Sequence, residues 1–204
     1  MAEQLDVINL ALSHIAQTPI TAVQLAALTG NVQVEAALRL WEYAREETLR
    51  AYNWGFAKVQ QALVITTDYD PAVYAYAYVY PTDCVAIRKV NVQASIDNTI
   101  SGKYKTVYDK EKSLQRIVTD IEDAYIEYTY DHDTPTLWDS AFVVAFAYRL
   151  AAELAKPLNG DDKQAEDKGK LFDIAISEAK RYDSDNKNEP HEGNTKSNYA
   201  EARG

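Results

Sequence analysis

Few residues of this chain have the types and spacing that catalysis or metal binding needs. The best metal candidate is the run Asp131-His132-Asp133, which Asp139 could join. Adjacent residues seldom converge on one ion without ligands from elsewhere, whereas Asp and Thr commonly form turns and begin helices. We therefore predict a polar turn between a strand and a helix at this place, and no metal site.

The single cysteine and the scattered carboxylates offer little for a catalytic site. A reactive thiol needs an electropositive setting, but Cys84 lies in Tyr-Pro-Thr-Asp-Cys-Val, which predicts a turn followed by a strand. A hydrolase would need paired carboxylates in a cleft, and Glu127, Asp131 and Asp133 form the only cluster worth testing. The 7 glycines are not clustered, so no phosphate-binding loop can be placed. We predict no catalytic residue, no cofactor and no enzyme.

Tyrosine is unusually frequent, with 15 Tyr against 4 Phe and 3 Trp. Tyr74, Tyr76, Tyr78 and Tyr80 occupy every second position, which places their rings on one face of a strand. Such a row could stack nucleic-acid bases, but no Lys or Arg is interleaved with it. We therefore predict that these tyrosines pack against another layer or bind a partner subunit.

The charge balance bears on possible partners. Asp and Glu total 31 against 21 Lys and Arg, which gives a formal net charge of −10. Sequence-independent DNA binding draws most of its affinity from cationic contacts to phosphates, so this balance disfavours it. An acidic surface suits a wall past which DNA slides without specific binding. The most apolar run, 141–152, is too short to span a bilayer, so we predict no membrane contact.

Hydrophobic periodicity predicts helices at both ends of the chain. Apolar residues recur at three- and four-residue spacing in four segments, which predicts helices over 3–17, 32–52, 137–156 and 162–183. Alternating residues and turn signals predict an inserted antiparallel β-sheet over about 56–130. The sequence thus predicts one α+β domain over 1–184, a bundle of two N-terminal and two C-terminal helices with a β insertion.

The apolar content collapses after the last predicted helix, so we predict an extended C-terminal arm over 185–204. Such a segment can order itself on a partner, and its polar and aromatic side chains are the candidates for contact. They are Asn186, Lys187, His191, Lys196, Tyr199 and Arg203.

Four segments together resemble the tail tubular protein A family of podovirus-type phages, the adaptor ring beneath the portal. The segments are Asn9 to Ile15 followed by Thr18-Pro19-Ile20, then Arg45 to Ala57, Tyr80 to Cys84, and Phe142 to Leu154 closing on Lys156 to Gly160. The segment from Arg45 to Ala57, with Trp54, is the most specific of them. Where the family often has Pro before this tryptophan and Asn after it, this chain has Asn53 and Gly55.

The resemblance implies a structural protein of the virion neck, made in the host bacterial cytoplasm. It implies a homo-oligomeric twelve-fold ring docked on the portal protein, which continues the DNA channel toward a tail nozzle protein. The alternatives are a different neck, head-completion or tail structural protein and, less favoured, a tail-associated cell-wall hydrolase.

Overall fold

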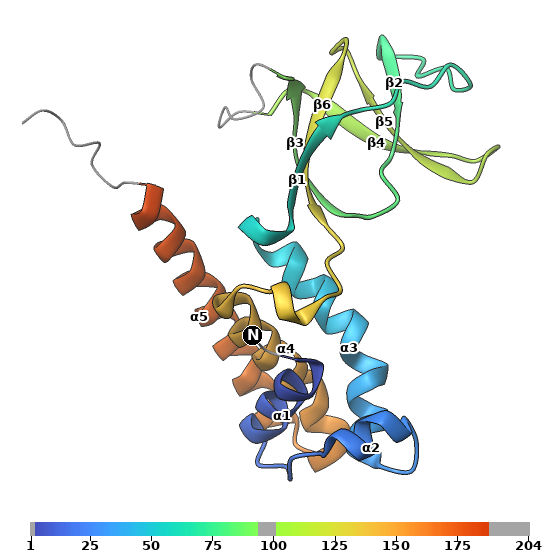
Figure 1. Cartoon of the computed structure of the whole chain (residues 1–204). Coiled ribbons are helices and arrows are strands. Elements are labelled where there is room, and N and C mark those ends of the chain that lie inside the picture. The colour runs from blue at the N-terminus through green and yellow to red at the C-terminus, as the bar shows by residue number, and fades with distance from the viewer. Residues whose placement is uncertain (1–2, 94–100, 188–204) are drawn as a thin grey trace, which may run out of the picture.

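Helices, strands and then helices follow one another along the chain, in the order that the periodicities predict. The computed structural model describes residues 3–93 and 101–187. The helices are α1 (Gln4–His14), α2 (Ala22–Ala27), α3 (Val32–Ala51), α4 (Ser140–Asn159) and α5 (Asp162–Lys187). The strands are β1 (Lys58–Ala62), β2 (Tyr76–Val79), β3 (Cys84–Val92), β4 (Tyr104–Asp109), β5 (Leu114–Thr119) and β6 (Ala124–Tyr130). Figure 1 shows the strands gathered beyond one end of the helices, and the predicted α+β fold class is confirmed.

Helix α4 is the centre of the helical bundle and packs against α1, α3 and α5. Its apolar residues cover most of its circumference, so Phe142, Phe146, Leu150 and Leu154 are all fully buried. Burying one such side chain contributes about 1.5–3 kcal/mol. This helix contains the most apolar run of the sequence, 141–152, which explains its deep burial.

The first predicted helix, 3–17, ends earlier than expected. Its C-cap is Ile15, and Ala16 has a left-handed backbone with φ 56°. Proline disfavours a helical residue before it, but here the chain leaves the helix one turn sooner because the Ile15 and Gln17 amides bond to the Leu12 carbonyl. Between the first two predicted helices lies the short helix α2, which begins with a capping box of Thr21 and Gln24.

The boundaries of the last two helices also differ from the prediction. Asp139 caps α4, so the helix begins at Ser140, after a short 3₁₀ helix (Pro135–Leu137), rather than at 137. The helix continues through Pro157 in its last turn, and Gly160, with φ 65°, ends it. Helix α5 extends to Lys187 rather than to 183, so the predicted arm cannot begin at 185.

The strands form two small sheets rather than the single sheet predicted. The first has the order β1-β6-β3 and the second β2-β5-β4, and all neighbours are antiparallel. Strand β2 is shorter than the row of alternating tyrosines suggests, because Tyr74 and Tyr80 lie outside it. Residues of both sheets enclose a second core of seven buried residues, centred on Tyr78 and Tyr128. A sheet's inward face must be covered, and here each sheet covers the other.

Among the described residues, no helix is long and apolar enough to cross a membrane.

Candidate functional site

The predicted tyrosine row packs largely inside the chain. Tyr78 is 1% exposed in the core between the sheets, and its hydroxyl donates a 2.8 Å hydrogen bond to the carbonyl of Ile121. Tyr76 and Tyr80 are half-buried and pack against the same core, while Tyr74 is half-buried in the segment before β2. The packing interpretation therefore holds for Tyr78, which offers no surface to a partner in this structure.

The predicted contact residues near the C-terminus divide between two parts of the chain. Asn186 and Lys187 belong to the last turn of α5. His191, Lys196, Tyr199 and Arg203 lie outside the described residues, so their role as partner contacts stays a prediction.

The Asp131-His132-Asp133 run serves local structure. One Asp131 oxygen lies 2.9 Å from the Arg45 guanidinium, and the His132 ring packs edge-on against Phe56. The hydroxyl of Thr134 donates to Asp133, and Asp139 accepts the Ala141 amide at the start of α4. Among the residues that the structure describes, no three His, Cys, Asp or Glu side chains could hold a metal ion together. Polar turn and helix cap are the functions that these residues serve here.

The hydrolase candidates do not form a pair in a cleft. Glu127 is 2% exposed, and its carboxylate accepts hydrogen bonds of 2.9 Å from Asn53 and 2.8 Å from Gln60. The Asp131 carboxylate forms an ion pair with Arg45, and Asp133 lies on the loop that follows β6. Cys84 is half-buried at the start of β3, and burial raises the pKa of its thiol, which therefore stays protonated at neutral pH.

A polar junction joins the bundle to the β region, and the prediction from sequence missed it. We define this junction as Arg45, Asn53, Arg88, Glu127 and Asp131. The Arg88 guanidinium donates to the carbonyls of Leu49, Arg50 and Tyr52, at 2.8, 3.1 and 2.6 Å, and to the Thr129 hydroxyl at 2.7 Å.

The carbonyls at a helix end lack partners within the helix and carry partial negative charge, so a cation from a strand suits them. Burial lowers the pKa of Arg88, although arginine stays charged in proteins. A single Arg in the otherwise apolar start of β3, Val85-Ala86-Ile87, is the only sequence signal that could have indicated this role.

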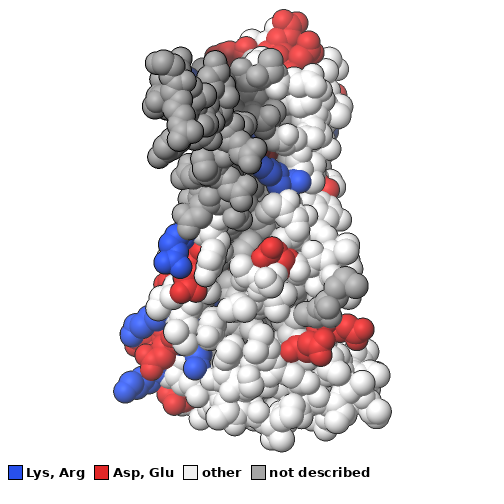
Figure 2. Space-filling view, turned by 60° about the vertical axis from the view of Figure 1, so that its left-hand side comes forward, with Lys and Arg blue, Asp and Glu red and all other residues white. Residues whose placement is uncertain are grey.

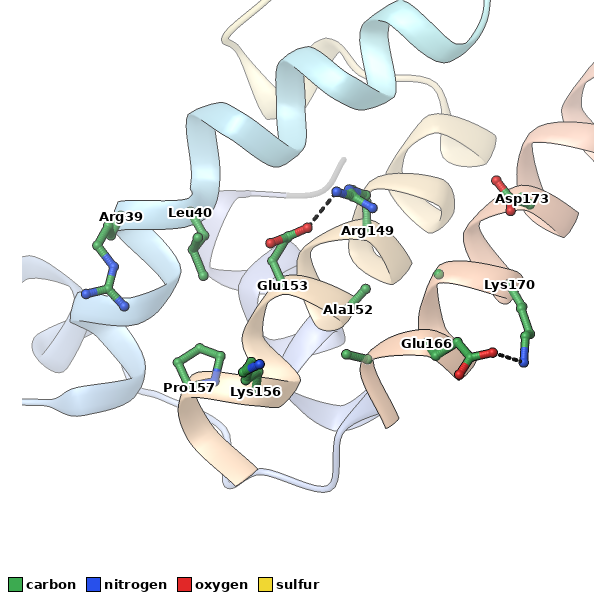
Figure 3. A pocket seen from close by; sticks show the side chains of 12 residues that line it. Arg39, Leu40, Arg149, Ala152, Glu153, Lys156, Pro157, Glu166, Lys170 and Asp173 are labelled. Carbon is green, nitrogen blue, oxygen red and sulfur yellow. Dashed lines mark hydrogen bonds and ion pairs between the residues drawn. The ribbon is translucent and has the colours of Figure 1, made fainter. Parts of the chain in front are cut away.

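The described surface has an open groove of about 740 Å³ between α3, α4 and α5. We call it the bundle groove. Figure 3 shows Arg39 and Leu40 on the α3 side, Arg149 and Glu153 reaching across from α4, and Lys170 on the α5 side. Small residues line its floor, namely Ala152, Ala165 and Gly169. Around these small residues the lining mixes cationic and acidic side chains, and Lys170 pairs with Glu166 at 2.8 Å.

No family model matches the chain, and no curated protein matches it in sequence.

Proposed function

We propose that this chain is a structural subunit of a bacteriophage neck, a head-to-tail adaptor. Twelve copies form a ring in the virion between the portal protein and the tail nozzle protein, and the ring surrounds the channel through which DNA passes. The chain catalyses no reaction in this role.

The observation that carries the proposal is that the segments with the family resemblance hold the fold together. The Asn9 side chain forms two hydrogen bonds with the backbone of Ile20. Its amide nitrogen donates to the Ile20 carbonyl at 3.0 Å, and its oxygen accepts the Ile20 N–H at 2.8 Å. The Asn159 side chain donates a 2.9 Å hydrogen bond to the carbonyl of Ile15, so the first and fourth segments contact each other. These contacts place residues of the resembling segments where they hold the fold together, which supports a shared architecture.

The second and third segments also form contacts that hold the fold together. Trp54 packs edge-on against Phe142 with ring centroids 5.1 Å apart, which joins the second segment to the fourth. Its indole N–H donates to the carbonyl of Thr48 at 2.8 Å. In the third segment, the carbonyl of Asp83 accepts the Asp131 amide at 2.9 Å. These contacts fix the helical bundle and the junction, and leave the outer surfaces for partners.

Helix α5 supplies one such surface. In Figure 1 it slants away from α3, and its C-terminal turns stand clear of the strands. Ile174 and Tyr182 on this helix are 52% and 59% exposed, although both are large and apolar. Exposed aromatic and aliphatic side chains on a projecting helix suit contact with another protein. We assign α5 and the segment after it, 188–204, to docking on the portal.

The charge of the chain suits a channel wall. With a formal net charge of −10, a ring of such chains repels phosphates and lets DNA slide. Figure 2 shows the charged side chains of one face dispersed among uncharged ones, without a broad patch of Lys and Arg.

The test is to mix the purified chain with purified portal and view the product by negative-stain electron microscopy. The expected result is an added ring on one end of the portal, whereas the chain alone stays largely monomeric at micromolar concentration. A matched sample that lacks 188–204 should keep its melting temperature and lose portal binding. Absence of a ring with the full chain would contradict the adaptor function, and binding by the truncated chain would move the docking surface to the bundle.

A further inference from the structure

The hairpin of β4 and β5 ends in a turn of fixed shape. Figure 1 shows this hairpin projecting beyond the other strands, to the right of the view. Near the turn, the buried side chains of Arg116 and Asp109 form an ion pair of 3.6 Å. The Asp109 carboxylate also accepts the backbone amides of Glu111 and Lys112, each at 3.1 Å. The hairpin therefore presents a preformed end to its surroundings.

The exposed residues at this end are cationic or apolar, with one exception. Since Arg116 and Asp109 neutralise each other, three exposed lysines remain against Glu111, a balance of 3 − 1 = +2 in a chain of net charge −10. Tyr108 and Leu114 are 63% and 49% exposed, and the strand register places them on opposite faces of the hairpin. We define the basic tip as Lys105, Tyr108, Lys110, Lys112 and Leu114.

The fold accounts for one of these lysines and leaves two unexplained. Lys105 lies on β4, an edge strand, where lysine discourages pairing with a further strand. Lys110 and Lys112 lie beyond the strand, and within 3–93 and 101–187 their ammonium groups have neither an ion pair nor a hydrogen bond. Unpaired cations beside exposed apolar side chains suit a contact with an acidic protein surface.

The opposite end of β5 has such a surface. Strand β5 is 6 residues long, so the turn that follows it lies about 20 Å from the basic tip. This turn carries three exposed carboxylates, Asp120, Glu122 and Asp123. Lys103 lies beside them, since its carbonyl accepts the Thr119 hydroxyl at 2.7 Å. The local balance, with Lys103 counted, is 1 − 3 = −2.

Exposed valines flank the acidic turn. Val92 is 42% exposed on β3, opposite the first residue of β6. Val73 is 86% exposed, in the loop whose Ala75 amide donates to Asp120 at 3.0 Å. That loop, 63–75, contains two more carboxylates and no Lys or Arg. Figure 2 shows acidic side chains gathered at the end of the β region furthest from the helices. We define the acidic pole as Val73, Val92, Asp120, Glu122 and Asp123.

We propose that the basic tip of one copy of this chain binds the acidic pole of a second copy. The two surfaces are complementary in charge, and the contact covers exposed apolar side chains of both. Because they lie at opposite ends of one strand, each bound pair keeps a free tip and a free pole for further copies, as a ring requires. The inference rests on the proposed ring and assigns a contact between neighbouring subunits.

Charge reversal on each surface tests the contact. Lys110→Glu with Lys112→Glu changes the formal net charge to −10 − 4 = −14 and should weaken self-association roughly tenfold or more. Glu122→Lys with Asp123→Lys changes it to −10 + 4 = −6 and should weaken self-association as strongly. The second variant separates a specific contact from general repulsion, since a lower net charge alone would strengthen association.

An equal mixture of the two double variants should associate as wild type does. In the mixture, the reversed tip of the first variant meets the reversed pole of the second, and the unchanged tip of the second meets the unchanged pole of the first. Arg39→Glu with Lys163→Glu is the matched control, because both residues are exposed on the helical bundle and the net charge is again −14. This control should associate nearly as wild type does, and its mixture with the Glu122→Lys, Asp123→Lys variant should not restore association.

Self-association is measured by sedimentation of the free chain at low salt and at concentrations approaching millimolar, without portal. A mixture that associates no better than either double variant alone would overturn the contact, as would a wild-type chain that stays monomeric at every concentration. A labelled DNA duplex should not bind the chain, and duplex binding that depends on Lys110 and Lys112 without self-association would overturn the second copy as partner. Ring formation on portal judges the adaptor function separately, so the two proposals can fail independently.

Discussion

The helical bundle and the β region are stabilised by different kinds of core. In the bundle, fully buried side chains such as Phe142 and Leu150 are apolar throughout and contribute through burial alone. In the β region the two largest buried side chains are tyrosines, and each hydroxyl has a partner: Tyr78 bonds to the carbonyl of Ile121, and Tyr128 to the carboxylate of Asp83. The bundle core therefore depends mainly on volume, with a few buried polar bonds such as that from the Trp54 N–H to the Thr48 carbonyl, whereas the centre of the β core depends on the placement of two hydroxyls.

The largest effect should come from the bundle core. Phe142→Ala removes a fully buried ring that contacts Trp54, Phe56 and Trp138, and should destabilise the chain by about 3–5 kcal/mol. Urea unfolding measures this change in the free energy of unfolding. Val144→Ala on the same helix, at a side chain 43% exposed, is the control and should cost far less. Equal costs would mean that burial does not govern the stability of α4.

The second-largest loss of stability should come from the junction. Arg88→Met keeps much of the side-chain length but removes the donors to the end of α3, and should cost about 2–3 kcal/mol because charged hydrogen bonds are lost. Amide hydrogen exchange should accelerate in the last turn of α3 and in β3.

Arg50→Met is the control for the junction, since the Arg50 side chain is 57% exposed and pairs with the exposed carboxylate of Glu46. If Arg88→Met left both stability and exchange at wild-type values, Arg88 would not hold the two regions together.

A smaller effect should come from one hydroxyl in the β core. Tyr78→Phe keeps the buried ring and leaves the Ile121 carbonyl without its 2.8 Å partner, at a cost of about 1 kcal/mol. The loss of stability can be followed by thermal melting. Tyr108→Phe, at a position 63% exposed, should leave the melting temperature unchanged. A neutral Tyr78→Phe would show that the Tyr78 hydroxyl adds nothing to the stability that its buried ring contributes.

The smallest effect concerns pH and belongs to the bundle. His14 stacks on Tyr148 with ring centroids 4.3 Å apart, and its pKa is lowered by burial first and then by Lys168. The folded state therefore favours the neutral ring, and the unfolded state binds the proton more readily. Stability from this residue is complete above the unfolded value of 6.5 and is lost as pH falls through the lower folded pKa.

Comparing His14→Gln with wild type across that range isolates the contribution, since the other titrating groups are common to both. The variant should show a shallower loss of stability between neutral pH and pH 5. Identical slopes would mean that the folded pKa of His14 is not depressed.

Much of the fold could be predicted from the sequence because its cause is local. Helical spacing located the helices that became α3, α4 and α5, and Asn31 caps α3 as its side chain suggests. Boundaries were less certain, because Ala16 and Gly160 end their helices through left-handed backbone rather than through the nearby prolines. Helix α2 was missed because its six residues are too few for a periodicity to appear.

At the candidate site, too, features with a local cause could be predicted from the sequence, and features that depend on distant residues could not. Alternation correctly gave Tyr78 an inward face, but sequence could not say that this face meets a second sheet of the same chain. The role of Arg88 arises from an element distant in sequence, the end of α3, whose carbonyls it binds.

By itself, then, the sequence determined the element types, the buried helix α4, the acidic charge and the polar turn at 131–133, since each follows from residues close together in the chain. Tertiary structure alone decided that the strands divide into two sheets, that Arg88 joins strand to helix, and that α3, α4 and α5 leave a groove open. The physical reason is that long-range packing selects among partners that local propensity leaves equivalent.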